Sequence, residues 1–232
     1  MKAFTVIAKW LFVLCLPVLL LTASVGWAVN SLWLYEHGFA KYHISQTTGL
    51  SDSELGKAAR GLISYFNSGQ DLINITVEKD GKPFTLFNER EVTHLKDVKD
   101  LFWLDYKVLF GTLVYVLAYG GVSLFWRRRR YWRQLALGVA IGSGMTLATM
   151  LALWIGSLVD FEGLFILFHL ISFSNDFWQL NPAMDYQIML FPEGFWYDAT
   201  LFIALRATAM AVILGILSAG HLMFNKKDLP YE

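Results

Sequence analysis

The sequence has little charge and almost no cysteine. Charged residues make up only 16% of the 232 residues, whereas hydrophobic residues make up 56%. A soluble chain carries about 25% charged residues, so this chain lacks the polar surface that a water-soluble enzyme needs. The high hydrophobic content also excludes an intrinsically disordered protein.

The single cysteine, Cys15, excludes an internal disulfide framework and a zinc site built from cysteines. The net charge is zero, and no basic face is long enough to indicate binding of nucleic acid. The charges that are present are unevenly placed, because 18 of the 38 lie between residues 36 and 100. The rest of the chain is nearly bare of charge, which is typical of an integral membrane protein.

Four apolar stretches are long enough to cross a bilayer, which takes roughly 20 residues. They lie near residues 10–30, 108–126, 134–159 and 199–222. Positive clusters flank them at Lys2 and Lys9, at the four arginines 127–130 with Arg133, and at Lys226 with Lys227. Four crossings put all three clusters on one side, so the positive-inside rule predicts that both termini are cytoplasmic. Residues 36–107 and 160–198 then lie together on the outer side. Within the third stretch, Gly138, Gly142 and Gly144 predict close packing of helices inside the bundle.

The pattern of residues 36–105 predicts a small folded cap inserted between the first two spans. Ser51 and Glu54 have the spacing of a capping box, in which the serine accepts an early backbone N–H and the glutamate reaches back. Apolar residues then repeat at helical spacing: Leu55, Ala59, Leu62 and Phe66. Alternation at Ile73, Ile75 and Val77, followed by the turn at residues 79–82, predicts a β-hairpin. From residue 89 the pattern is helical again, and we expect this helix to run directly into the second span.

Residues 160–198 are aromatic and apolar but are interrupted by several polar residues. The segment is too interrupted to span a membrane and too apolar for water, so we expect an interfacial or re-entrant stretch. The predicted fold class is thus a mainly α integral membrane protein. It is a single membrane domain, a four-helix transmembrane bundle with a small extracytoplasmic α+β cap.

His94 and His169 are both predicted at the outer rim of the bundle. An imidazole can take and return a proton near neutral pH, as acyl transfer requires. On a helix, Glu91 lies one turn before His94 and Asp97 one turn after it, so either carboxylate could hold the imidazole by a hydrogen bond. The alternative is that each histidine is an ordinary hydrogen-bonding residue of the membrane interface.

Arg206 interrupts the fourth span, where a charge is costly and usually faces the bundle interior or a wet cavity. It could shape the site or stabilise an oxyanion, or it could be part of a structural ion pair. Its candidate partners are Asp176, Asp185 and Glu193.

Three weaker hypotheses concern other polar residues. His37 and His43 could join the two histidines in a metal site, but their spacing gives no support, and no metal is predicted. Ser172 follows His169 by three residues and could act as a nucleophile, although no elbow glycines surround it. His221, near the cytoplasmic end of the fourth span, is expected to cap its helix.

Two stretches resemble the bacterial lipoprotein intramolecular transacylase family, four-span membrane proteins with an extracytoplasmic cap. Residues 91–98 fit the family pattern E-x-x-H-x-x-D-V, and residues 168–176 fit F-H-x-x-x-F-x-N-D. The resemblance implies that His94 and His169 are catalytic. The residues predicted to support them or to bind substrate are Glu91, Asp97, Asn175, Asp176, Trp178, Asp185 and Arg206.

The resemblance implies an acyltransferase of the bacterial cytoplasmic membrane whose active site faces the extracytoplasmic side. Its substrate is a lipoprotein whose N-terminal cysteine bears a diacylglyceryl group, and its other partner is membrane lipid. The α-amino group attacks the sn-2 ester, and the acyl chain moves to nitrogen to give the lyso-form. The reaction needs no cofactor. Two alternatives remain: a non-catalytic membrane module that binds lipidated proteins or lipids, and a lipid-directed hydrolase in which water replaces the amine.

Overall fold

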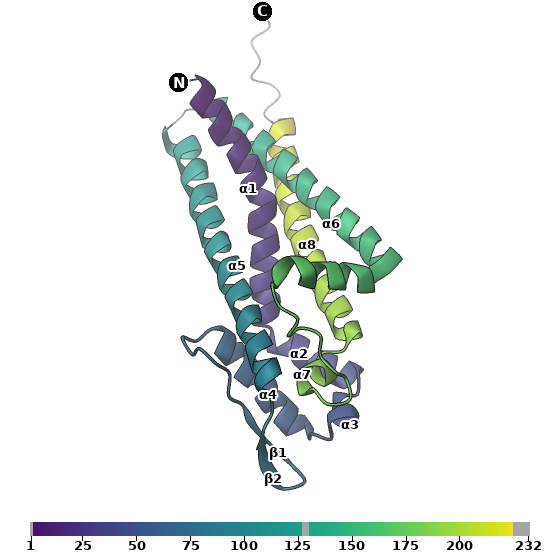
Figure 1. Ribbon diagram of the computed structural model, residues 1–232. Coiled ribbons are helices and arrows are strands. Elements are labelled where there is room, and N and C mark those ends of the chain that lie inside the picture. Colours follow the sequence, from purple (N-terminus) through teal and green to yellow (C-terminus); the bar gives the residue numbers. More distant parts are fainter. Residues whose placement is uncertain (1, 127–129, 225–232) are drawn as a thin grey trace, which may run out of the picture. The chain divides into compact units, whose positions relative to one another are not determined.

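The computed structural model describes residues 2–126 and 130–224, and Figure 1 shows the order of its elements. The expected positive clusters at residues 127–129 and at Lys226 and Lys227 lie outside the described residues. In chain order the elements are α1 (Lys2–Val29), α2 (Leu32–Lys41), α3 (Ile44–Thr48), α4 (Asp52–Phe66), β1 (Thr76–Lys79), β2 (Lys82–Thr85), α5 (Glu89–Gly121), the π-helical η1 (Val122–Trp126), α6 (Arg130–Ser172), α7 (Tyr186–Leu190) and α8 (Glu193–Phe224).

Four of the described helices are long and apolar enough to cross a membrane. They are Thr5–Val29, Glu89–Phe125, Trp132–Ser172 and Glu193–Phe224, and each overlaps one predicted span. The prediction that the helix starting at residue 89 runs directly into the second span is confirmed by α5.

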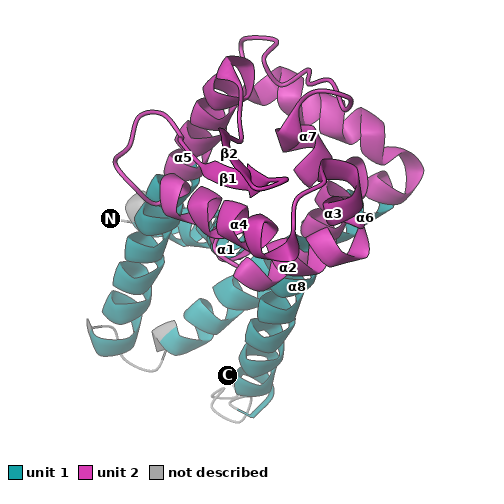
Figure 2. Cartoon of the chain, turned by 90° about the horizontal axis from the view of Figure 1, so that it is seen from below, with its two compact units in different colours: residues 1–25, 105–155, 203–232 teal, residues 26–104, 156–202 magenta. Residues whose placement is uncertain are grey.

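The chain divides into two compact units, which Figure 2 shows in different colours. Unit 1 comprises residues 1–25, 105–155 and 203–232, and unit 2 comprises residues 26–104 and 156–202. The four long helices contribute to both units. Every predicted site residue except Arg206 belongs to unit 2.

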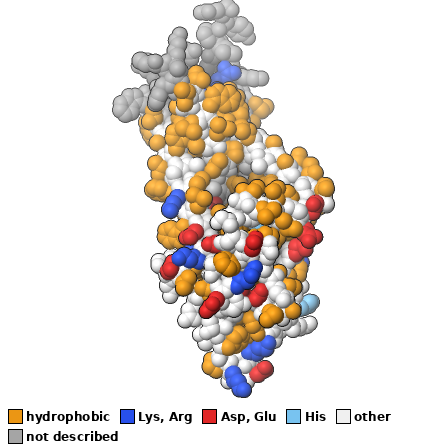
Figure 3. Space-filling view, in the orientation of Figure 1, with side chains coloured by type: hydrophobic (Ala, Val, Ile, Leu, Met, Phe, Trp, Pro, Cys, Tyr) orange, Lys and Arg blue, Asp and Glu red, His pale blue; other side chains and the backbone are white. Residues whose placement is uncertain are grey.

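The helices of unit 1 bury some apolar side chains and expose many others. Leu16 and Leu20 of α1 form a buried cluster with Ala211 of α8. Large apolar side chains such as Phe110 and Leu117 of α5 are exposed. On the face shown in Figure 3, apolar side chains cover unit 1, whereas the charged side chains gather mainly on unit 2. An exposed apolar surface of this extent is typical of contact with lipid.

Glycines of α6 allow a close approach to α1 within unit 1. A Cβ added at Gly142 would lie 2.8 Å from Cδ2 of Leu16 and 3.1 Å from the carbonyl oxygen of Val13. At Gly138 the added atom would also meet α1 side chains, at 3.2 Å. The predicted packing role of these two glycines is therefore confirmed. At Gly144, by contrast, an added Cβ would meet no described atom within 4 Å.

Unit 2 contains the predicted cap helix and hairpin. The four residues expected on the apolar face of α4 are all buried: Leu55, Ala59, Leu62 and Phe66. Strands β1 and β2 pair antiparallel, with Val77 opposite Phe84. Asp80 and Gly81 turn the chain with φ angles of 54° and 72°, the left-handed values that a tight hairpin turn requires.

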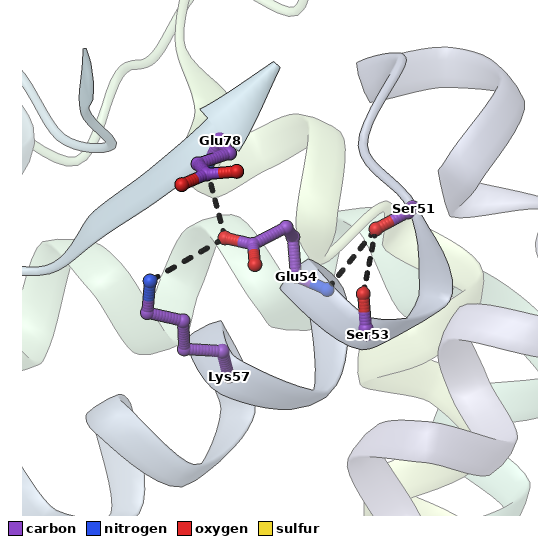
Figure 4. Close-up of polar contacts among 5 residues, drawn as sticks. All are labelled: Ser51, Ser53, Glu54, Lys57 and Glu78. Atoms are coloured by element: carbon purple, nitrogen blue, oxygen red, sulfur yellow. Dashed lines mark hydrogen bonds and ion pairs between the residues drawn. The ribbon is translucent and has the colours of Figure 1, made fainter. Parts of the chain in front are cut away.

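The capping box predicted at the start of α4 is only half formed (Figure 4). The Ser51 hydroxyl accepts the backbone N–H of Glu54 at 3.4 Å, as expected. The Glu54 carboxylate, however, accepts the backbone N–H of Glu78 at 2.8 Å and lies 3.6 Å from the Lys57 ammonium. A two-stranded sheet leaves unpaired N–H groups along its edges. One of them, the N–H of Glu78, donates to the Glu54 carboxylate. The prediction that Glu54 reaches back to the N-cap is therefore wrong, and Glu54 joins α4 to β1 instead.

Helix α6 is interrupted at Asp160, whose φ of −159° and ψ of 84° are not helical. The Asp160 carboxylate accepts the backbone N–H of Gly163 at 2.8 Å, so Asp160 is the N-cap of a new helical segment. The apolar stretch predicted at residues 134–159 therefore ends at a real break. Residues 161–172, the first part of the segment expected to be interfacial or re-entrant, form a short helix that carries His169.

Candidate active site

The two candidate histidines lie side by side in unit 2. The ring centroids of His94 on α5 and His169 on α6 are 6.1 Å apart, and the ring planes are inclined by 31°. His94 is 4% exposed and His169 is 6% exposed. Two groups that can carry protons, although distant in sequence, are thus adjacent and both buried.

A hydrogen bond sets the tautomer of His169. Its Nδ1 lies 2.7 Å from the carbonyl oxygen of Phe165, one turn earlier on the same helix. A carbonyl oxygen can only accept, so Nδ1 donates and carries the hydrogen. In the neutral imidazole Nε2 then bears the lone pair, which makes it the basic nitrogen.

His94 has a different environment. Its Nδ1 is buried and has no hydrogen-bond partner among the described residues. The Phe173 ring and the imidazole pack in a T-shaped arrangement, with 5.0 Å between centroids. Buried polar atoms nearly always have a partner, so this nitrogen leaves one hydrogen-bonding position open in the site.

Aromatic rings surround His169, and one of them, Phe173, also contacts His94. The His169 ring has four aromatic neighbours at centroid distances of 4.3–5.5 Å: Phe165, Phe168, Phe173 and Trp178. Such a wall excludes water from the imidazole and strengthens the electrostatic interactions inside the site.

Glu91 does not hold the imidazole. This side chain is 1% exposed, and its two oxygens accept the backbone N–H of Asn88 at 2.8 Å and of Gln187 at 2.6 Å. The Asn88 amide oxygen accepts the Glu91 N–H at 3.1 Å in return. Asn88 and Glu91 therefore form a reciprocal capping box at the start of α5, and Glu91 also binds the start of α7.

Asp185 extends the same network. One of its oxygens accepts the Asn88 side-chain amide at 2.8 Å, and the other accepts the backbone N–H of Asn181 at 2.6 Å. We call Asn88, Glu91, Asp185 and the backbone of Gln187 the Glu91 network. It joins the first turn of the helix that bears His94 to the segment that follows the helix of His169.

Two further contacts fasten this segment to α5. Asp97 accepts the side-chain amide of Asn175 at 2.8 Å. Arg90 donates to the backbone carbonyl of Asp176 at 2.5 Å, and its guanidinium lies over the Phe177 ring. Asp97 thus has Asn175 rather than an imidazole as its hydrogen-bond partner, and Asp176 contributes its main chain.

The remaining candidates lie elsewhere. Arg206 is half-buried on the part of α8 that belongs to unit 1. His37 stacks on Trp33 at 4.9 Å, and His43 precedes α3 with a φ of 52°. His221, in unit 1, contacts the Trp132 ring at 6.1 Å.

The described residues contain no group of three or more His, Cys, Asp or Glu placed to hold a metal ion. Across residues 2–126 and 130–224, no hydrogen bond joins Ser172 to His169. Neither a metal site nor a Ser–His pair is therefore supported by this geometry.

Several residues of the site were not predicted from the sequence. Phe165 and Phe173 lie four residues before and after His169, so helical spacing could have indicated at least Phe165 as its neighbour. Gln187 contributes only a backbone N–H, for which its side chain gives no signal.

Four helices able to cross a membrane and a buried histidine pair define a membrane protein with a candidate active site in unit 2. The chain belongs to the family described as lipoprotein intramolecular transacylase Lit, whose model matches residues 10–196. This stretch contains both histidines and all the other predicted site residues except Arg206. The predicted family is thereby confirmed.

Solved structures agree with the predicted fold class. The chain is similar to a crystal structure of the membrane integral lipoprotein intramolecular transacylase Lit from Bacillus cereus, with a TM-score of 0.79 and 19% identity over 98% of this chain and 99% of that one. A variant of that protein in which one histidine is replaced by arginine matches with a TM-score of 0.74 and 20% identity, over 97% of this chain and 95% of that one. The mainly α, membrane-integral fold is therefore confirmed.

A relative from Aquifex aeolicus, described only as an uncharacterized protein, is 33% identical over 153 residues. The match covers 65% of this chain and 62% of the relative, so it spans less than two thirds of that protein's length.

Proposed function

We propose that this protein is an intramolecular transacylase of bacterial lipoproteins. It would move the sn-2 acyl chain of the diacylglyceryl group to the α-amino group of the N-terminal cysteine. The observation that carries the proposal is the buried pair of imidazoles 6.1 Å apart, in a chain that belongs to this family.

The reaction conserves every atom of the substrate. The amine nitrogen attacks the ester carbonyl carbon and forms a tetrahedral intermediate with a negatively charged oxygen. An N–C bond forms, the C–O bond to glycerol breaks, and the proton lost by nitrogen ends on the glycerol oxygen. Because the amine and the ester belong to one molecule, positioning supplies much of the rate enhancement.

His169 is suited to carry that proton. Nδ1 is fixed as a donor by Phe165, so Nε2 accepts the proton of the attacking amine and returns it to the departing oxygen. His94, with one N–H in its neutral form, then donates a hydrogen bond to the oxyanion. The aromatic wall formed by Phe165, Phe168, Phe173 and Trp178 keeps water away from the intermediate, which favours transfer over hydrolysis.

The other predicted site residues act by holding the elements of the site in place. Glu91 and Asp185 hold the outer segment against α5, while Asp97, Asn175 and the main chain of Asp176 fix the loop that carries Trp178. Arg206 remains a sequence-based candidate for a supporting role.

The positive clusters of the sequence support an orientation with both termini in the cytoplasm. In this orientation the site of unit 2 faces the extracytoplasmic side of the bacterial cytoplasmic membrane. Diacylglyceryl-modified lipoproteins reach it from the outer leaflet, with membrane lipid around the acyl chains.

Mass spectrometry of a reporter lipoprotein tests the proposal. The reporter is expressed with the intact protein in a host that lacks N-acylation, and fragmentation of its N-terminal peptide locates the acyl chains. We expect a peptide of unchanged mass with one chain on nitrogen and one on glycerol. Release of free fatty acid would identify a hydrolase, and an unmodified reporter despite confirmed expression would favour a binding module.

A further inference from the structure

A cleft of about 280 Å³ lies beside the histidine pair in unit 2. Its walls include two carboxylates of α5, Asp97 and Asp100, and three polar residues at the end of α6 and just after it, Ser172, Ser174 and Asn175. A concave site with a few convergent polar groups is the usual form of a small-ligand site.

The cleft adjoins the candidate active site through Phe173. This ring lines the cleft and lies 5.0 Å from the His94 ring and 5.5 Å from the His169 ring. His94 and Asp97 are three residues apart on α5 and share a face of the helix. The cleft therefore lies along the same face of α5 as His94, whose Nδ1 is buried and has no hydrogen-bond partner among the described residues.

The two carboxylates of the cleft, Asp97 and Asp100, form no salt bridge with a described lysine or arginine. The neighbouring lysines bond to other groups, because Lys96 pairs with Asp71 at 2.6 Å and Lys99 donates to the Gln70 carbonyl. They act on the cleft carboxylates only as nearby charges. The cleft thus combines negative charge with hydrogen-bonding groups next to a proton carrier.

We propose that this cleft binds the α-ammonium group of the substrate's N-terminal cysteine. The inference rests on the proposed function and assigns the place of the reacting amine. Asp100 attracts the ammonium, and Asp97, held by Asn175 at 2.8 Å, accepts one of its N–H groups. The ammonium loses one proton to solvent at the exposed Asp100 side of the cleft and becomes the nucleophilic amine. This amine lies next to the histidines, and the proton that it loses on attack passes to Nε2 of His169 and then to the glycerol oxygen.

The same arrangement distinguishes substrate from product. The product carries a neutral amide in place of the ammonium, so it loses the attraction of both carboxylates. We therefore expect the cleft to favour the free amine and to release the N-acylated chain.

A non-reactive ligand tests this assignment without turnover. It is a peptide whose N-terminal cysteine bears a dialkylglyceryl group with ether bonds, so that no acyl chain can move. Binding to the full-length protein in detergent is compared for this peptide and its N-acetylated form. We expect the free amine to bind about tenfold or more tightly, and Asp97→Asn or Asp100→Asn to abolish most of that preference.

A matched variant controls for charge. Asp80→Asn removes one carboxylate at the exposed hairpin turn, where asparagine tolerates a positive φ, and it should keep the full preference. Asp100 is exposed, so its substitution is compatible with folding.

Equal binding of the two peptides by the intact protein, or an unchanged preference in both cleft variants, would overturn the assignment. Equal competition by a short-chain phosphatidylethanolamine would also overturn it, because the cleft would then bind a lipid headgroup. A failure of the proposed function is seen separately, as the absence of acyl transfer from an ester-linked lipopeptide by the intact protein.

Discussion

Glu91 accepts the backbone N–H of Gln187 at 2.6 Å while it completes the capping box of Asn88. One buried carboxylate therefore accepts hydrogen bonds both at the first turn of the helix that bears His94 and at the start of α7. Because α7 follows the helix of His169 and the loop after it, this contact helps to set the separation of the two imidazoles.

Glu91→Gln is expected to slow acyl transfer with little effect on the apparent affinity for lipoprotein. The glutamine amide retains one acceptor, but its NH₂ group faces a backbone N–H, which costs about 1–3 kcal/mol for an unsatisfied buried donor. Steady-state assays of a diacylglyceryl lipopeptide would measure kcat and KM separately.

Glu89→Gln is the control for this experiment, since Glu89 lies in the same turn of α5 but is exposed. Both variants should fold, as judged by gel filtration in detergent. An increase in KM with unchanged kcat for Glu91→Gln would contradict a positioning role and indicate direct contact with substrate.

Removing either imidazole should slow the reaction by at least about 100-fold. In the proposed mechanism, His94→Ala and His169→Ala each remove one of the two groups that handle protons or charge in the transition state, and such a group is worth about 100-fold to 10,000-fold in rate. His37→Ala, at an exposed position that stacks on Trp33, should retain the full rate. Acyl transfer to the reporter at the normal rate in either active-site variant would refute the two-histidine mechanism.

The close contact between α6 and α1 predicts opposite effects at two neighbouring glycines. Gly142→Ala forces a methyl group against Leu16 and the Val13 carbonyl, and overpacking of this kind costs about 1–3 kcal/mol. Gly144→Ala meets no described atom and should be neutral or stabilising by up to about 1 kcal/mol, because alanine favours the helix. Thermal unfolding in the same detergent compares the two, and equal melting temperatures would contradict the packing described.

The half-formed capping box of α4 is expected to contribute to the stability of unit 2. Ser51→Ala removes the acceptor for the Glu54 N–H and should cost about 1 kcal/mol. Ser64→Ala makes the same chemical change at an exposed position within the same helix and should leave stability unchanged. Proteolysis of the cap region under native conditions would report the difference, and identical rates for the two variants would exclude a capping role for Ser51.

The two capping boxes show what the sequence could and could not predict. Ser51 and Glu54 have the same spacing as Asn88 and Glu91, yet only the second pair is reciprocal. The difference lies in a competing donor, the edge N–H of Glu78, which comes from a strand more than twenty residues away. Local spacing predicts which groups can bond, whereas tertiary packing decides which of them do.

The long helices were predictable because apolar length is a local property of the sequence. The nearness of His94 and His169 could be expected only in outline, from the topology of the spans. The aromatic wall around His169 depends on the break at Asp160 and on the path of the following loop. Trp178 reaches the imidazole from that loop, and no periodicity in the sequence places it there.

The break at Asp160 has a mechanical consequence. His94 stands on a helix that continues without interruption into the apolar stretch beginning at Val108, whereas His169 stands on a segment that starts anew after Asp160. A change in bilayer thickness is accommodated by tilting of the spans, and an interrupted helix does not transmit such a tilt as a rigid rod. The Glu91 network can then keep the second histidine in register with the first. The separation of the two imidazoles would thus depend little on the lipid composition of the membrane.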